Sequence, residues 1–165
     1  MFYTYMKSPV GQLLIAGDED GIKHLSFETG KKPTTPKPGW KLNTLFFTGA
    51  ITQLQEYFDG KRTKFQLKLA PTGTAFQIKV LEELKKIPYG ETCSYGDIAN
   101  RIGNPNASRA VGAANGRNPV SIIIPCHRVI GHSGKLVGFG GGLKTKETLL
   151  SIEKRNSHRL ESCQA

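Results

Sequence analysis

The spacing of apolar residues changes near residue 71, and this change limits the folds open to the chain. Upstream, short apolar and β-branched runs alternate with turn signals, a pattern typical of strands. Downstream, residues 75–84 carry apolar side chains at helical spacing, and Thr74 stands where a helix cap is needed. We therefore expect two domains in the 165-residue chain, an α/β domain over residues 1–74 and a mainly α domain over residues 75–165.

The first domain predicts a small sheet with one helix. Three apolar or β-branched runs separated by turn signals predict an antiparallel meander; they are residues 2–5, 11–16 and 22–27. Residues 31–39 are rich in proline and lysine and predict a loop. Apolar residues recur at helical spacing over residues 49–58, and residues 65–69 alternate as one further strand.

The second domain predicts short helices. Ser94 is placed to cap a helix that runs to Ile102, and Ser108 to cap the next one. Two short helices joined by a tight turn in a basic protein suggest a helix-turn-helix, although such pairs also occur in proteins that bind no DNA. Residues 120–124 are apolar and β-branched and predict a buried short strand or extended segment. A last helix is expected over residues 145–154, with a frayed tail after it.

The charge balance favours an anionic partner. Lys and Arg number 23 against 13 Asp and Glu, a net charge of +10, which favours a polyanion but does not by itself decide for nucleic acid. No apolar stretch approaches the roughly 18 residues of a membrane span, and residues 1–10 lack the pattern of a signal peptide. We expect a protein of the cytoplasm, associated with the nucleoid if bacterial, and without a membrane partner.

The cysteines point to reactivity rather than to cross-linking. Cys93, Cys126 and Cys163 form an odd set without a Cys-x-x-Cys pair, which argues against disulfides and a cysteine-rich zinc site. A thiol has a pKa of about 8.5, so a reactive one needs help from a neighbour. His127, oriented by a carboxylate such as Glu153, could accept the thiol proton, directly or through water. In an arbitrary Cys-His pair, a buried cysteine beside a structural histidine is the commoner arrangement.

The sequence around this pair closely resembles the active-site signature of the O6-alkylguanine-DNA alkyltransferases of the Ogt-like kind. The core of the match is Asn-Pro-Val-Ser-Ile-Ile-Ile-Pro-Cys-His-Arg-Val-Ile-Gly, residues 118–131. Further matching segments keep near-constant spacing; they are residues 87–92, 94–99, 109–114, 141–143 and 146–153. The first half matches chiefly at Ser-Pro-Val-Gly, residues 8–11, and Tyr-Phe-Asp-Gly, residues 57–60.

This resemblance implies a direct-reversal DNA repair enzyme. Such enzymes move an alkyl group irreversibly from O6-alkylguanine, and in some cases O4-alkylthymine, to their own cysteine in a single turnover. It also implies an RNase H-like first domain and a winged helix-turn-helix in the second. Some relatives bind zinc in the first domain, but His24 is the only histidine in the first 92 residues and no cysteine lies there. We expect no metal and no cofactor.

The resemblance assigns roles in the site. Cys126 is the alkyl acceptor, His127 the general base acting through water, and Glu153 the carboxylate that holds the histidine. Asn118 braces the turn before the cysteine, and Tyr95 serves N3 of the guanine. In substrate binding, Val129 offers a carbonyl to the exocyclic amine, and Phe139 and Gly140 belong to the loop that supplies donors to O6.

The partner implied is double-stranded DNA carrying O6-alkylguanine, bound by a monomer through the minor groove. The damaged base must be flipped out of the stack. By the resemblance, Arg109 fills the gap, and small residues on its helix allow close approach to the groove. The expected DNA contacts are Arg109, Ala110, Gly112, Ala113, Arg117 and Arg128.

Two departures and three alternatives remain open. Phe139 stands where many relatives have Tyr, and Gly140 where a small polar residue or alanine is common, which predicts a roomier, looser pocket. A lesion-binding relative without enzymatic activity lacks the acceptor cysteine, which is present here. A Cys-His hydrolase would turn over, whereas a thioether is not hydrolysed in water. A basic transcription factor leaves residues 125–128 unexplained. Cys93 and Cys163 are expected to be bystanders.

Overall fold

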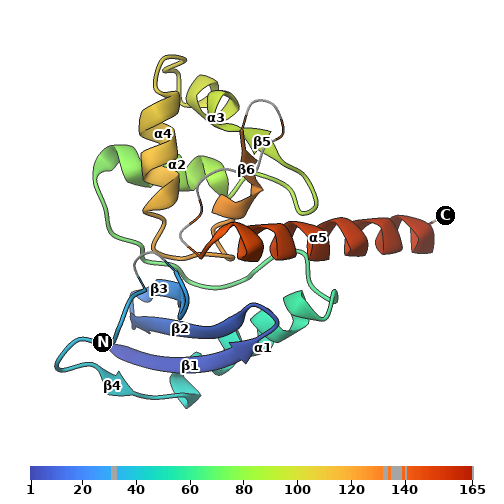
Figure 1. Ribbon diagram of the computed structural model, residues 1–165. Helices are drawn as coiled ribbons and strands as arrows, with labels where there is room; N and C mark the ends of the chain where they lie inside the picture. The colour runs from blue at the N-terminus through green and yellow to red at the C-terminus, as the bar shows by residue number, and fades with distance from the viewer. Residues whose placement is uncertain (31–32, 132–133, 135–138, 140, 165) are drawn as a thin grey trace.

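The computed structural model describes residues 1–30, 33–131, 134, 139 and 141–164 (Figure 1). The first half contains the expected antiparallel meander of β1 (Phe2–Ser8), β2 (Gly11–Asp18) and β3 (Gly21–Phe27). A short β4 (Lys41–Leu42) pairs in parallel with β1, so the sheet order is β3-β2-β1-β4. The meander forms because β-branched and aromatic residues alternate between glycine turns.

One helix packs on this sheet, as predicted. A short 3-10 turn, η1 (Leu45–Phe47), leads into α1 (Thr48–Phe58), whose Ala50, Leu54 and Tyr57 are buried. The strand predicted over residues 65–69 is wrong, because this segment makes only an isolated parallel bridge from Leu69 to Ile22. The side chain of Gln53 on α1 bonds both the N–H and the carbonyl of Gln66, so a helix amide takes the place of a partner strand.

The second half begins with two well-capped helices. Thr74 and Gln77 form a capping box on α2 (Ala75–Leu84), and Ser94 and Asp97 form one on α3 (Tyr95–Arg101), in agreement with the predicted starts. The next helix, α4 (Ser108–Gly116), packs against α2 and α3. Its predicted cap is wrong, since Ala107 holds the N-cap position without a side-chain hydrogen bond and Ser108 is already helical.

The segment after α4 departs most from prediction. Residues 120–124 form turns rather than a strand, with an isolated bridge from Val120 to Leu25 and Ile122 at φ 72°. A 3-10 turn, η2 (Cys126–Arg128), follows and leads into β6 (Val129–Ile130), which pairs in parallel with β5 (Cys93–Ser94). The last helix, α5 (Leu143–Gln164), continues through the segment predicted to be frayed.

The two halves meet along α5 and along the free edge of β3. In Figure 1, α5 runs between the sheet below and helices α2 to α4 above. Asn156 of α5 lies against Gly60, so closely that a Cβ there would meet its amide at 2.6–2.7 Å. On the sheet edge, Leu25 accepts from the N–H of Ser121 and donates to the carbonyl of Pro119. The segment before the cysteine is therefore anchored on the first half. Within the described residues, no helix is long and apolar enough to cross a membrane.

Candidate active site

Cys126 begins the η2 turn and is buried, with 3% of its surface exposed. The turn is fixed from both sides. The N–H of Cys126 donates to the carbonyl of Ile124, and the N–H of Arg128 donates to the carbonyl of Pro125. Asn118 donates to the carbonyl of Ile124 at 2.8 Å and accepts from the N–H of Val120 at 3.0 Å. The brace expected at Asn118 is thus present as geometry.

The groups around Cys126 act on its pKa in opposite directions. Burial raises the pKa of Cys126, and it outweighs hydrogen bonds from Asn118 and Ser121 and the positive charge of Lys146, which act in the other direction. The neighbours therefore act to lower the pKa of this thiol, but burial is the larger effect. A nucleophilic thiolate has to be formed during the reaction, and this requires a proton acceptor within reach.

The expected relay partners are brought together in the core. His127 is fully buried, and its Nε2 lies 2.5 Å from Oε2 of Glu153 on α5. Its other nitrogen, Nδ1, is buried and has no hydrogen-bond partner among the described residues. Burial lowers the pKa of His127 more than the neighbouring Glu153 raises it, which favours a neutral ring. A neutral ring that donates from Nε2 to Glu153 leaves Nδ1 as a proton acceptor.

Glu153 is surrounded by donors. Besides His127, its carboxylate accepts from Nε and Nη2 of Arg128 at 2.7 and 3.1 Å, from the N–H of Gly90 at 3.2 Å and from the hydroxyl of Tyr57 at 2.6 Å. Although burial alone would raise it, the pKa of Glu153 is lowered to about 2 by His127 and Arg128. The carboxylate is therefore ionised and fixed in place.

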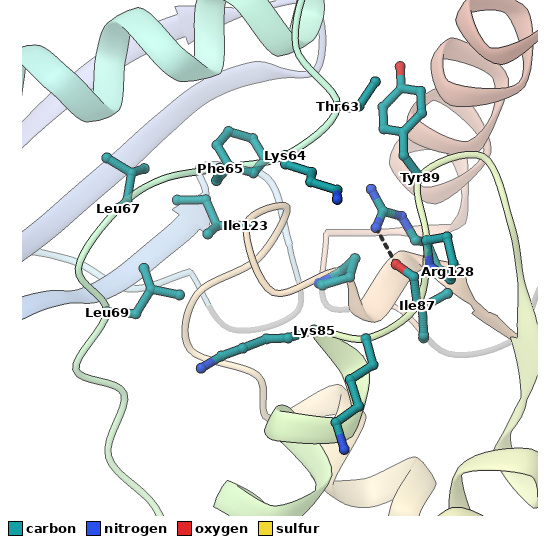
Figure 2. Close-up of a pocket in the computed structure, with 13 residues that line it drawn as sticks. Thr63, Lys64, Phe65, Leu67, Leu69, Lys85, Ile87, Tyr89, Ile123 and Arg128 are labelled. Atoms are coloured by element: carbon teal, nitrogen blue, oxygen red, sulfur yellow. Dashed lines mark hydrogen bonds between the residues drawn. The ribbon is translucent and has the colours of Figure 1, made fainter.

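Arg128 is buried in the core and does not lie on the surface where a DNA contact was expected. Only 6% of its surface is exposed, and its Nη1 donates to the carbonyl of Ile87 at 2.7 Å while the rest of the guanidinium binds Glu153. Figure 2 shows this bond at the wall of a cavity of about 620 Å³ between residues 63–69 and the second half. The positive charge of Arg128 is neutralised in the core by the Glu153 carboxylate, which it binds through two nitrogens, since an unpaired buried charge is costly. We correct the assignment of Arg128 from DNA contact to ion-pair partner of Glu153.

Three further residues support the site and were not singled out from the sequence. Asn115 of α4, 3% exposed, donates to the carbonyl of Cys126 at 3.3 Å. Lys146 of α5 has no exposed surface and donates to the carbonyl of Val129 at 2.6 Å, the carbonyl expected to receive the guanine amine. A carbonyl has two lone pairs, so one can still serve a base. Tyr57 reaches the site from the first half. A polar residue among the buried positions of a helix is the signal that could have revealed Asn115.

A cavity of about 600 Å³ opens between β3 and α4. Tyr95, Asn118 and Ser121 are among its lining residues, and Asn118 is the side chain that braces the turn before Cys126. Phe139 lines it as well and packs edge-on against Phe27, with ring centroids 5.6 Å apart. Gly140 lies outside the described residues. The first half thus contributes a wall, through His24, Ser26, Phe27, Pro33 and Thr34.

Tyr95 lies between the cavity and α4. Its pKa is raised by burial, with a smaller contribution from the negative charge that Cys126 would carry. Its ring is 3.8 Å from where a Cβ on Gly112 would stand, an ordinary van der Waals distance, so α4 passes directly beside the tyrosine. Tyr95 is thus placed at the cavity wall, between α4 and the turn of Cys126.

The outer face of α4 is open and basic. Arg109, Ala110 and Ala113 are exposed, and Arg117 is exposed just after the helix end. Gly112, Ala113 and Arg117 also line the cavity, so a ligand on this face has a direct path to it. Among the described residues, no group of three or more His, Cys, Asp or Glu could hold a metal ion.

The fold and the site together define a two-domain protein in which a buried cysteine lies next to a histidine-carboxylate pair, with a basic helix face open nearby. Family models agree. Residues 1–71 match the ribonuclease-like domain of 6-O-methylguanine DNA methyltransferase, and residues 75–155 match its DNA-binding domain. The chain belongs to this family, whose members repair DNA by direct transfer of the alkyl group to a cysteine.

Individual relatives cover almost the whole chain. It is 54% identical to the methylated-DNA--protein-cysteine methyltransferase of Methanosarcina acetivorans, over 93% of this chain and 98% of the relative. It is 49% identical to the protein of that name from Mycolicibacterium paratuberculosis, over 94% and 93%. The crystal structure of Mycobacterium tuberculosis OGT in complex with DNA superimposes with a TM-score of 0.88 at 46% identity, over 94% of each chain. The family resemblance and the two-part fold expected from the sequence are confirmed.

Proposed function

We propose that the protein removes the alkyl group from O6-alkylguanine in double-stranded DNA, with Cys126 as the acceptor. The observation that carries this proposal is the position of the cysteine. It is buried in the turn that Asn118 braces, next to a cavity lined by Asn118 and Ser121, and the His127–Glu153 pair follows it directly. A flipped base entering from α4 would bring its O6 substituent to the sulfur.

The chemistry follows from which groups can take and give protons. His127 Nδ1 takes the thiol proton through a water molecule, and Glu153 stabilises the imidazolium that forms. The sulfur attacks the alkyl carbon, so that an S–C bond forms as the C–O6 bond breaks. The electron pair of the breaking C–O6 bond stays on the guanine, and Tyr95 offsets the developing charge with a hydrogen bond to N3. The base then takes up one proton overall, which balances the one lost by the thiol and returns His127 to its neutral form. The product thioether is stable in water, so each molecule reacts once.

DNA binding is proposed for the open face of α4. Arg109 is exposed at its first turn, where a side chain could enter the stack in place of the flipped base, and Ala110, Gly112 and Ala113 leave room for a narrow groove. Arg117 stands free to contact a phosphate. We also propose that the protein acts as a monomer in the cytoplasm, where its DNA substrate lies.

The decisive test is mass spectrometry after incubation with duplex DNA carrying O6-methylguanine. One methyl group on Cys126, with guanine restored and no turnover, is the expected result, and Cys126→Ser should bind the lesion without reacting. Binding without any change in mass would make the protein a lesion-binding relative. Multiple turnovers would point to a hydrolase.

The DNA interface is tested by substitution and by salt. Arg109→Ala should slow repair in duplex DNA by about tenfold or more, because base flipping costs a few kcal/mol. Lys79→Ala, on α2, is the matched control for loss of one positive charge. Binding should weaken steeply as salt rises, and a flat response would contradict phosphate contacts.

A further inference from the structure

Tyr57 reaches the relay from the other half of the molecule. It lies on α1, has no exposed surface, and its hydroxyl donates to Oε2 of Glu153 at 2.6 Å. The two residues are 96 positions apart in the chain. A hydroxyl that gives a short hydrogen bond to an ionised carboxylate makes a strong, charge-assisted contact. The first half therefore contributes a polar group to the proton-transfer machinery as well as packing.

The Tyr57 hydroxyl binds the same carboxylate oxygen of Glu153 as the histidine does. Oε2 of Glu153 is also the atom that faces Nε2 of His127, and Nη2 of Arg128 reaches it at 3.1 Å, whereas Oε1 is held by Nε of Arg128 and the N–H of Gly90. Donors that share one oxygen divide its negative charge among them. The pKa of Tyr57 is raised well above its usual value, chiefly by burial, so the hydroxyl stays protonated and acts as a donor.

We propose that Tyr57 is a positioning residue for alkyl transfer, which moderates the basicity of Glu153 and so keeps His127 neutral and ready to accept the Cys126 proton. This inference rests on the proposed role of His127. Without the hydroxyl, Oε2 would attract the histidine proton more strongly and favour the imidazolium in the resting enzyme. An imidazolium has no lone pair for the thiol proton.

The hydroxyl is held in place by its surroundings. The Tyr57 ring lies 5.5 Å from that of Phe65 and meets Tyr89 edge-on at 6.1 Å. Tyr89 in turn lies over the Arg128 guanidinium, 5.6 Å away. In Figure 2, Phe65, Tyr89 and Arg128 line the same cavity at this junction.

Other charged groups also face His127 and remain unchanged by a substitution at Tyr57. Arg128, from the same turn, and Lys146, from α5, both lower the pKa of His127, while Glu153 raises it. Cys126 is the neighbouring titratable group on the turn. A change in the behaviour of His127 in a Tyr57 variant is therefore attributable to the carboxylate that the two residues share.

The experiment compares Tyr57→Phe with Tyr89→Phe. Both changes remove one phenol hydroxyl and keep the ring, but the Tyr89 hydroxyl accepts from Asn156 and is not bonded to Glu153. Single-turnover rates of methyl transfer from duplex O6-methylguanine are measured from pH 5 to 9. In Tyr57→Phe we expect the acidic limb of the profile to move up by about one pH unit, so that the rate falls about tenfold at acidic pH and recovers as pH rises. Tyr89→Phe should keep the wild-type limb.

Each outcome has a distinct meaning. An equal loss at every pH, or an unchanged profile, would overturn the role of Tyr57 and leave only packing. If Tyr57→Phe does not fold, 3-fluorotyrosine at position 57 keeps the shape with a stronger donor and should move the limb to lower pH; an unmoved limb overturns the proposal. Wild-type protein that gains no methyl at Cys126 would instead overturn the proposed function itself.

Discussion

Cys93 and Cys126 lie on neighbouring segments yet have opposite expected fates. Cys93 on β5 pairs with Val129, three residues after Cys126. Both cysteines are buried, at 7% and 3% exposure, and burial raises the pKa of both thiols. Neither burial nor thiol acidity separates them.

Their surroundings do. Near Cys93, Arg101 lowers the thiol pKa and Asp97 raises it, so the neighbouring charges act against each other. Near Cys126, two hydrogen bonds and the charge of Lys146 act together, and His127 with Glu153 is adjacent. The comparison teaches that a buried cysteine becomes a nucleophile through an acceptor for its proton and a cavity for its electrophile.

The largest expected effect comes from exchanging each thiol for a hydroxyl. Cys126→Ser should abolish methyl transfer, because a serine hydroxyl is a far weaker nucleophile than a cysteine thiolate. Cys93→Ser should transfer at the wild-type rate. Single-turnover assays with intact-mass readout measure both; loss of transfer in Cys93→Ser with the fold intact would break the comparison.

Next in size is the loss of the proton acceptor. His127→Gln should slow transfer by about 10²–10⁴-fold, the range typical of a general base. His24→Gln, a change of the same type at the cavity wall, should cost far less. A rate near wild type in His127→Gln would show that the thiol loses its proton by another route.

The ionised carboxylate of Glu153 should contribute to the stability of the fold against acid. The pKa of Glu153 is about 2 against an ordinary 4.5, so it stabilises the fold above about pH 4.5 and this stability is lost as pH falls toward 2. The shift corresponds to about 3 kcal/mol. In chemical unfolding, the free energy of unfolding of Glu153→Gln should fall less between pH 5 and 2.5 than that of the wild type.

The control for this substitution is Glu82→Gln, which removes a carboxylate from an exposed pair with Lys85. It should leave the pH dependence of unfolding almost unchanged, because surface ion pairs contribute little. Equal acid sensitivity in wild type and Glu153→Gln would mean that other groups carry the effect.

The smallest effect concerns labelling of the native thiols. Iodoacetamide should modify Cys126 several-fold faster than Cys93, because a cavity opens beside it, and both rates should rise with pH as thiolate forms. Peptide mapping after brief labelling gives the ratio. Faster labelling of Cys93 would show that access, rather than the relay, distinguishes the two.

The sequence predicted most of the fold and the residues of the relay. The meander, α1 and the capped starts of α2 and α3 follow from local signals such as Thr74 and Ser94. Residues 120–124 form turns instead of the predicted strand or extended segment, because the Asn118 brace and the contacts with β3 override their β-branched composition.

Side-chain partners across the two halves were not predictable in the same way. From the sequence, Arg128 is predicted to contact DNA like other basic residues. Only the fold shows that it pairs with Glu153. Tyr57 follows helical spacing like any core aromatic, and its hydroxyl contact depends on how α1 meets α5. These residues lie in the segments that match the family, but the contacts between them depend on the tertiary structure.

Ile122 ties the position of the acceptor to the core around it. A β-branched residue at φ 72° is costly by about 1–2 kcal/mol, while burying its side chain contributes about as much or more in return. The bend before the acceptor is therefore unfavourable until the surrounding core closes around it. The position of Cys126 is therefore established together with the core around Ile122 rather than by the local sequence alone.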